Sequence, residues 1–92
     1  MPEKDQISSN VNIGKSCLIN KRVIIGHDSS IGDYSVISPN ASIGGHTSIG
    51  RETFIGLGAC IRDRIKIGNN VIVGMGAVVT KDVDDNTING RK

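Results

Sequence analysis

The chain has 92 residues, of which 37% are hydrophobic, and 11 basic against 9 acidic side chains give it a formal net charge of +2. This length allows one domain with a thin core. The balanced charge argues against a nucleic-acid partner, and one Tyr and one Phe offer no platform for stacking bases. Fifteen Ile and eight Val against two Leu, together with 12 Gly, favour short strands and exclude a helical bundle.

The cellular location follows from what the sequence lacks. The first residues, MPEKDQ, have no apolar core of a signal peptide, and no apolar run is long enough for a membrane span. Cys17 and Cys60 are far apart and show no metal-type spacing, which is typical of reduced thiols. We therefore expect a cytoplasmic protein without a membrane partner.

An aliphatic residue recurs at every sixth position, thirteen times without an insertion, and Gly follows it eight times. A period of six fits neither a helix nor a plain alternating strand, but it fits a short strand followed by a bend. Before this repeat we predict a polar lead-in at residues 1–6, and after it, from Asp85, a polar tail at residues 85–92. The repeated residues are Ile7, Ile13, Ile19, Ile25, Ile31, Ile37, Ile43, Ile49, Ile55, Ile61, Ile67, Val73 and Val79.

This pattern is the hexapeptide repeat, and the chain resembles the hexapeptide-repeat acyltransferases that carry it. The resemblance implies an all-β fold, a left-handed parallel β-helix in which three consecutive hexads form one coil. Residues 7–84 would then form about four coils stacked at ~4.8 Å. A domain of this size with open strand edges is expected to associate with further copies.

Residues that are three hexads apart stack in columns in such a fold. One column places Gly45 directly above His27. In the neighbouring column His46 stands above Asp28, and Arg64 and Asp82 continue it as a ladder of alternating charges. His46 is therefore interpreted as a rung of this ladder on a solvated face.

The stretch from Ile25 to Gly50, with its His-Asp pair, resembles the sialic-acid O-acetyltransferases and UDP-amino-sugar N-acetyltransferases. The segments at residues 54–59 and 71–83 are similar to the same subfamily. The resemblance implies that His27 is a general base, that Asp28 raises the basicity of its imidazole, and that the N–H of Gly45 stabilises an oxyanion. Such chemistry suits imidazole, whose pKa lies near neutrality.

The resemblance also implies acetyl-CoA as the acyl donor, held in a groove between the β-helices of a homotrimer. The positions that match its donor contacts are Gly45, Leu57 and Met75, and Lys81 would meet the CoA phosphates. An ordinary solvated lysine is the alternative for Lys81. No metal ligand is expected.

The predicted function is an acetyl-CoA-dependent O- or N-acetyltransferase whose acceptor is a small sugar or sugar nucleotide. Val36 stands where the family often has a second histidine, Met75 replaces a small residue, and the preceding αβ domain of many relatives is not in these 92 residues. A non-catalytic trimeric β-helix scaffold is therefore the alternative. A zinc carbonic anhydrase needs about three histidine ligands, which two histidines in different columns do not supply.

Overall fold

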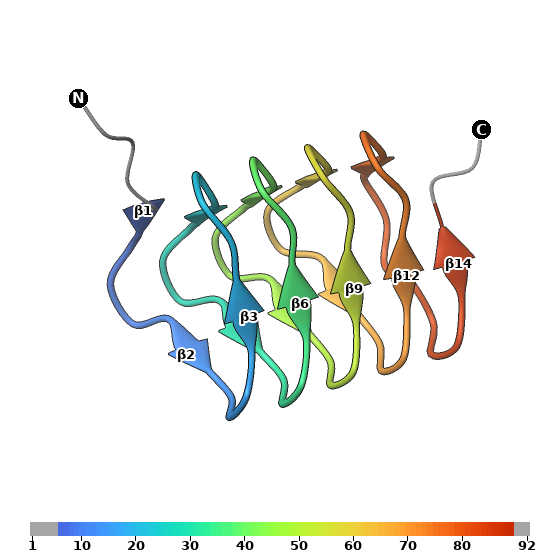
Figure 1. The fold of residues 1–92 in the computed structure, drawn as a ribbon, viewed down its shortest axis with the longest axis horizontal. Coiled ribbons are helices and arrows are strands. Elements are labelled where there is room, and N and C mark those ends of the chain that lie inside the picture. The colour runs from blue at the N-terminus through green and yellow to red at the C-terminus, as the bar shows by residue number, and fades with distance from the viewer. Residues whose placement is uncertain (1–5, 90–92) are drawn as a thin grey trace.

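The computed structural model describes residues 6–89 as a prism of three parallel sheets built from two-residue strands (Figure 1). Sheet A consists of β1 (Gln6–Ile7), β4 (Ile24–Ile25), β7 (Ser42–Ile43), β10 (Cys60–Ile61) and β13 (Val78–Val79). Sheet B consists of β2 (Asn12–Ile13), β5 (Ser30–Ile31), β8 (Ser48–Ile49) and β11 (Lys66–Ile67). Sheet C consists of β3 (Leu18–Ile19), β6 (Val36–Ile37), β9 (Phe54–Ile55), β12 (Ile72–Val73) and β14 (Ile88–Asn89).

Strands β1 to β13 pass in turn from sheet A to sheet B to sheet C. Within each sheet, neighbouring strands belong to successive coils and run parallel. Ile25 pairs with Ile43 and Ile43 with Ile61, an offset of three hexads at each step. This all-β solenoid of about four turns matches the left-handed β-helix of hexapeptide repeats, so the predicted fold class is confirmed. Within the described residues, no helix is long and apolar enough to cross a membrane.

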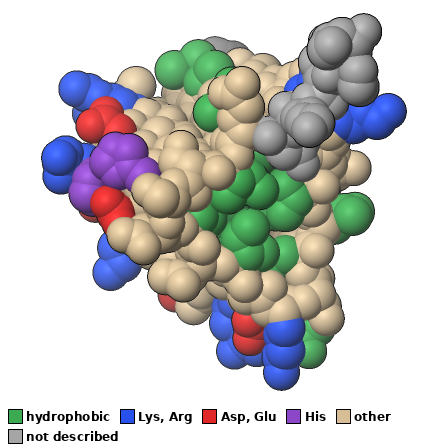
Figure 2. Space-filling view, turned by 90° about the vertical axis from the view of Figure 1, so that its left-hand side faces the viewer, with side chains coloured by type: hydrophobic (Ala, Val, Ile, Leu, Met, Phe, Trp, Pro, Cys, Tyr) green, Lys and Arg blue, Asp and Glu red, His purple; other side chains and the backbone are tan. Residues whose placement is uncertain are grey.

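In β1 to β13 the second residue of each strand points into the prism, and from Ile25 to Val79 these side chains are buried. At the N-terminal end none of residues 6–89 stacks over the first coil, and Ile7 and Ile13 are 43% and 38% exposed. Figure 2 faces this end and shows hydrophobic side chains at its centre. Buried hydroxyls are satisfied by the backbone, as where Ser29 Oγ donates to the carbonyl of Gly44 at 2.8 Å.

At the C-terminal end the stacking continues further than the repeat predicts. Strand β14 lies inside the segment that the sequence assigned to the polar tail, and Ile88 pairs with Ile72 at an offset two positions short of three hexads. Val83 bridges to Ile67 with the same shortened offset. The last coil is thus shorter than the others, so the spacing of six fails at Asp85 although the stacking goes on. Most of the lead-in, residues 1–5, lies outside the described residues.

Candidate active site

The corner between sheets A and B carries the two residues predicted to perform acid–base chemistry. His27 and Asp28 lie in the turn that joins β4 to β5, and Gly45 and His46 occupy the next turn of the same corner, between β7 and β8. We call this the histidine corner. Figure 2 shows both histidines together on one side of the molecule, among acidic and basic side chains.

His27 and Asp28 are in direct contact. The Nδ1 atom of His27 lies 3.1 Å from Oδ2 of Asp28. Neighbours in an extended strand point to opposite faces, but Asp28 sits at the bend with φ of 62°. The left-handed conformation turns its carboxylate back to the imidazole. Both side chains are exposed, at 58% for His27 and 40% for Asp28, and so can meet a ligand.

The structure confirms that Gly45 lies above His27. The N–H of His46 donates to the carbonyl of His27 at 2.9 Å, which fixes the two turns against each other. A Cβ atom on Gly45 would lie 3.1 Å from that carbonyl oxygen and 3.8 Å from Cε1 of the His27 ring. The carbonyl of Gly45 accepts from the N–H of Arg64, but no acceptor among the described residues takes the N–H of Gly45. That N–H is free to bind a developing negative charge.

His46 is closer to His27 than its place in another column suggests. The two rings meet edge to face with centroids 5.0 Å apart, and Nε2 of His46 lies 3.8 Å from Oδ2 of Asp28. The hydrogen bond from His27 holds the pKa of Asp28 below its ordinary value, and a hydrogen bond from Asn10 lowers it further. The contact between the two rings is not predictable from the repeat, because an offset of three hexads describes neighbours along a column and not across two columns.

One ligand atom each from His27, Asp28 and His46 lie within 4.8 Å of one another. The three side chains together could hold a metal ion. The sequence predicted no metal ligand, because the two histidines belong to different columns.

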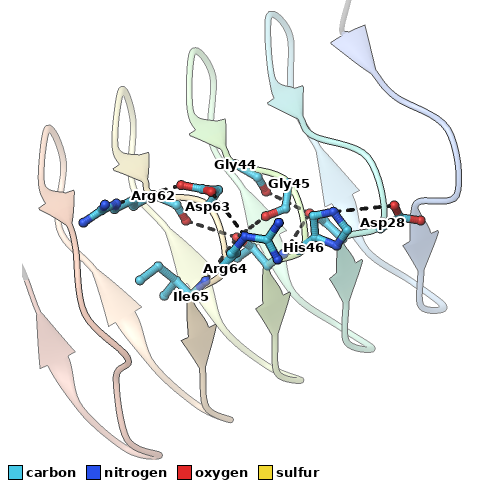
Figure 3. A network of polar contacts seen from close by, with 10 residues as sticks. Asp28, Gly44, Gly45, His46, Arg62, Asp63, Arg64 and Ile65 are labelled. Atoms are coloured by element: carbon cyan, nitrogen blue, oxygen red, sulfur yellow. Dashed lines mark hydrogen bonds and ion pairs between the residues drawn. The ribbon is translucent and has the colours of Figure 1, made fainter.

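Basic and acidic side chains continue the corner toward the C-terminus (Figure 3). Asp63 pairs with Arg62 and Arg64, each at 3.8 Å, and these residues line a surface hollow together with Lys81. The charge ladder does not continue to Asp82 in the predicted way. Because the last coil is shorter, the carboxylate of Asp82 accepts from the N–H of Lys66 at 2.8 Å.

The predicted donor contacts Leu57 and Met75 lie at another corner, between sheets C and A. They occupy the turns from β9 to β10 and from β12 to β13, where Gly58 and Gly76 have φ of 69° and 71°. Both side chains are exposed. Within one chain, sheet A separates this corner from the histidine corner, so one chain does not bring all predicted site residues together.

Val36 lies on the outward face of β6 in sheet C, between Leu18 and Phe54. Sheet C does not adjoin the histidine corner. A histidine at this position would therefore be remote from His27 of the same chain, and its absence leaves the histidine corner unchanged.

Comparison with known proteins agrees with the repeat. Residues 10–45 match the family described as bacterial transferase hexapeptide (six repeats). Residues 46–81 match the hexapeptide repeat of succinyl-transferase. No curated protein matches the chain significantly.

Several solved structures are similar to the chain. Serine acetyltransferase isoform 3 of Entamoeba histolytica, solved with cysteine, is 27% identical with a TM-score of 0.86, over 90% of this chain and 33% of that one. The GDP-perosamine N-acetyltransferase of Caulobacter crescentus, solved as its H141A mutant with CoA and GDP-perosamine, is 26% identical with a TM-score of 0.70, over 92% and 49%. The acetyltransferase domain of PglB from Neisseria gonorrhoeae FA1090, solved with acetyl coenzyme A, is 27% identical with a TM-score of 0.78, over 92% and 50%. The chain thus spans half or less of the length of each of these three structures.

Proposed function

The chain belongs to the hexapeptide-repeat family of transferases, and on that premise we propose that it is an acetyl-CoA-dependent O- or N-acetyltransferase. The acceptor is a small molecule with an amine or hydroxyl group, of the sugar or sugar-nucleotide class that the Caulobacter crescentus relative binds. The observation that carries the proposal is the histidine corner, where Nδ1 of His27 lies 3.1 Å from Asp28 Oδ2 and Gly45, without a side chain, lies directly above His27.

His27 acts as the general base. Asp28 accepts a hydrogen bond from Nδ1, which leaves Nε2 of the neutral ring as the proton acceptor. As the acceptor's amine or hydroxyl attacks the thioester carbonyl, Nε2 takes the proton that the nucleophile loses. Asp28 stabilises the imidazolium so formed.

Gly45 stabilises the negative charge that develops on the carbonyl oxygen during the attack. A fixed backbone N–H needs no reorganisation at that moment, and one such donor contributes about 3 kcal/mol to transition-state stabilisation in known cases. When the tetrahedral intermediate collapses, the C–S bond breaks and the CoA thiolate leaves.

The donor groove is formed by two chains of a homotrimer. The histidine corner of one chain and the Leu57–Met75 corner of its neighbour come together if sheet A faces the three-fold axis. Leu57, Met75 and Gly45 then contact the pantetheine, and Lys81, in the hollow with Arg62 and Arg64, meets the phosphates. The acetyl-CoA donor and the free thiols of Cys17 and Cys60 fit a cytoplasmic enzyme.

The test is His27→Ala, assayed for acetyl transfer with an acceptor found by screening sugar nucleotides and amino sugars. The turnover should fall by roughly 10²–10⁴-fold, while binding of acetyl-CoA by calorimetry stays near the wild-type value. The control is His46→Asn, because Asn tolerates the φ of 55° at this position and lacks an imidazole. It should retain activity.

Loss of transfer in His46→Asn with retention in His27→Ala would assign the base to the other histidine. A wild-type chain that shows neither turnover nor a saturable rise in melting temperature with acetyl-CoA would favour the scaffold function instead.

A further inference from the structure

The histidine corner combines three metal-ligating groups from two successive coils. His27 and Asp28 come from one turn and His46 from the turn stacked upon it, and the N–H of His46 fixes the distance between the two backbones. The separations are 3.1 Å from His27 Nδ1 to Asp28 Oδ2 and 3.8 Å from His46 Nε2 to the same oxygen. The three ligand atoms lie within 4.8 Å of one another.

These separations are close to what a tetrahedral zinc ion requires. Zn–N and Zn–O bonds of about 2.0–2.2 Å place neighbouring ligand atoms about 3.3 Å apart in a tetrahedron. Side-chain rotation can close the remaining gap, because the side chains of His27, Asp28 and His46 are 58%, 40% and 41% exposed. Two imidazoles with one carboxylate are a ligand set that zinc accepts, and a fourth position remains for water.

We propose that His27, Asp28 and His46 form a Zn²⁺ site that inhibits acetyl transfer. The inhibition, but not the binding, depends on the proposed function. A neutral imidazole that binds zinc through Nε2 gives up the lone pair that receives the proton. One that binds through Nδ1 carries its proton on Nε2. In either case His27 no longer acts as a base, so bound zinc and catalysis exclude each other.

Binding is tested by calorimetric titration of ZnCl₂ into the untagged full chain. We expect one ion per chain, with an affinity at least about tenfold lower in His46→Asn and in Asp28→Asn, since each loses a ligand. Asp63→Asn makes the same exchange in the same corner outside the cluster and should bind as the wild type does. Cys60→Ser should also bind normally, which separates the site from the exposed thiol. No binding, or equal affinity in wild type and His46→Asn, would overturn the site.

The second measurement is acetyl transfer at increasing ZnCl₂, followed by EDTA. Zinc should inhibit the wild type, EDTA should restore it, and His46→Asn should remain active with at least about tenfold lower sensitivity. Equal inhibition of both proteins would overturn the inhibitory role. A wild type that binds zinc but transfers no acetyl group under any condition would count against the proposed function, while the titration would still establish the ion's site.

Discussion

Gly44 and Gly45 are adjacent in the histidine corner, but their surroundings differ. A Cβ on Gly44 would overlap the backbone of Asp63 in the next coil, whereas a Cβ on Gly45 would meet only the backbone and ring edge of His27. Gly44 therefore permits the coils to stack, and Gly45 leaves open the space above His27.

We expect Gly44→Ala to destabilise the fold by about 1–3 kcal/mol, because backbone on both sides must shift. Gly45→Ala should leave the melting temperature within a few degrees of wild type and lower kcat/KM by on the order of tenfold or more, because its methyl group displaces ligand near His27. Thermal unfolding and acetyl transfer on both variants check this. The reverse pattern would show that Gly45 is needed for stacking and not for the site.

Asp28 makes stability depend on pH at the acidic end. Its pKa is lowered first by the hydrogen bond from His27, so its folded value lies below the unfolded value of about 4. The sign follows from linkage: the contribution is complete above the unfolded pKa and is lost as the pH falls through the folded pKa. In urea unfolding between pH 6 and pH 2, the stability advantage of wild type over Asp28→Asn should shrink below about pH 4. In a His27→Ala background the advantage above about pH 4 should be smaller. A constant advantage down to pH 2 would contradict this origin.

At the residue scale, the sequence predicts vertical neighbours well and lateral neighbours poorly. A fixed offset of three hexads places Gly45 over His27 and His46 over Asp28, as the structure has them. The contact of His27 with Asp28, and of the two rings with each other, depends on left-handed bends at Asp28 and His46. Positive φ is uncommon outside Gly, and neither residue type is restricted to that conformation, so the bend is not readable from these two positions.

At the element scale, the spacing of six predicts every strand from β1 to β13 because one aliphatic side chain directed into the prism anchors each. It fails only where the last coil shortens. There Val83 takes the place that Asp85 would have had, and β14 pairs two positions out of the predicted register. A spacing rule cannot anticipate a deletion, although Val83 is the only aliphatic residue between Val79 and Ile88 and so the one able to close the core there.

The anchors carry the stability of each element. Ile49, the buried residue of β8, is 2% exposed, so Ile49→Ala should cost about 2–5 kcal/mol through lost burial and the cavity left behind. Arg51 is exposed, and its backbone N–H, which donates to Asn69 Oδ1, survives substitution. Arg51→Ala should therefore cost less than about 0.5 kcal/mol. Chemical denaturation of both variants measures the difference, and equal losses would mean that the stacked backbone, not the core, determines stability.

At the scale of the whole molecule, the three faces of the prism differ. The outward residues of sheet B are polar: Asn12, Ser30, Ser48 and Lys66. Those of sheet C are apolar throughout: Leu18, Val36, Phe54, Ile72 and Ile88. Those of sheet A are mixed, with Ile24, Cys60 and Val78 exposed. Exposed apolar side chains favour association, and both sheet C and sheet A carry them. Of these two faces, only sheet A lies between the histidine corner and the Leu57–Met75 corner, so the proposed groove requires sheet A at the interface.

We predict a homotrimer with sheet A at its centre. Val78 is 70% exposed in the single chain, and three copies would approach one another at the axis. A lysine there would place three like charges in an apolar interface, where unpaired charge is costly. Light scattering should give the wild type a mass of about three times the 9.7 kDa of one chain, and Val78→Lys should dissociate and lose acetyl transfer.

The control is Ser48→Lys, an exposed change on sheet B, which should leave both the mass and the activity unchanged. A wild type with the 9.7 kDa mass of one chain that transfers acetyl groups would contradict both the assembly and the shared groove, because one chain holds His27 and Met75 at different corners.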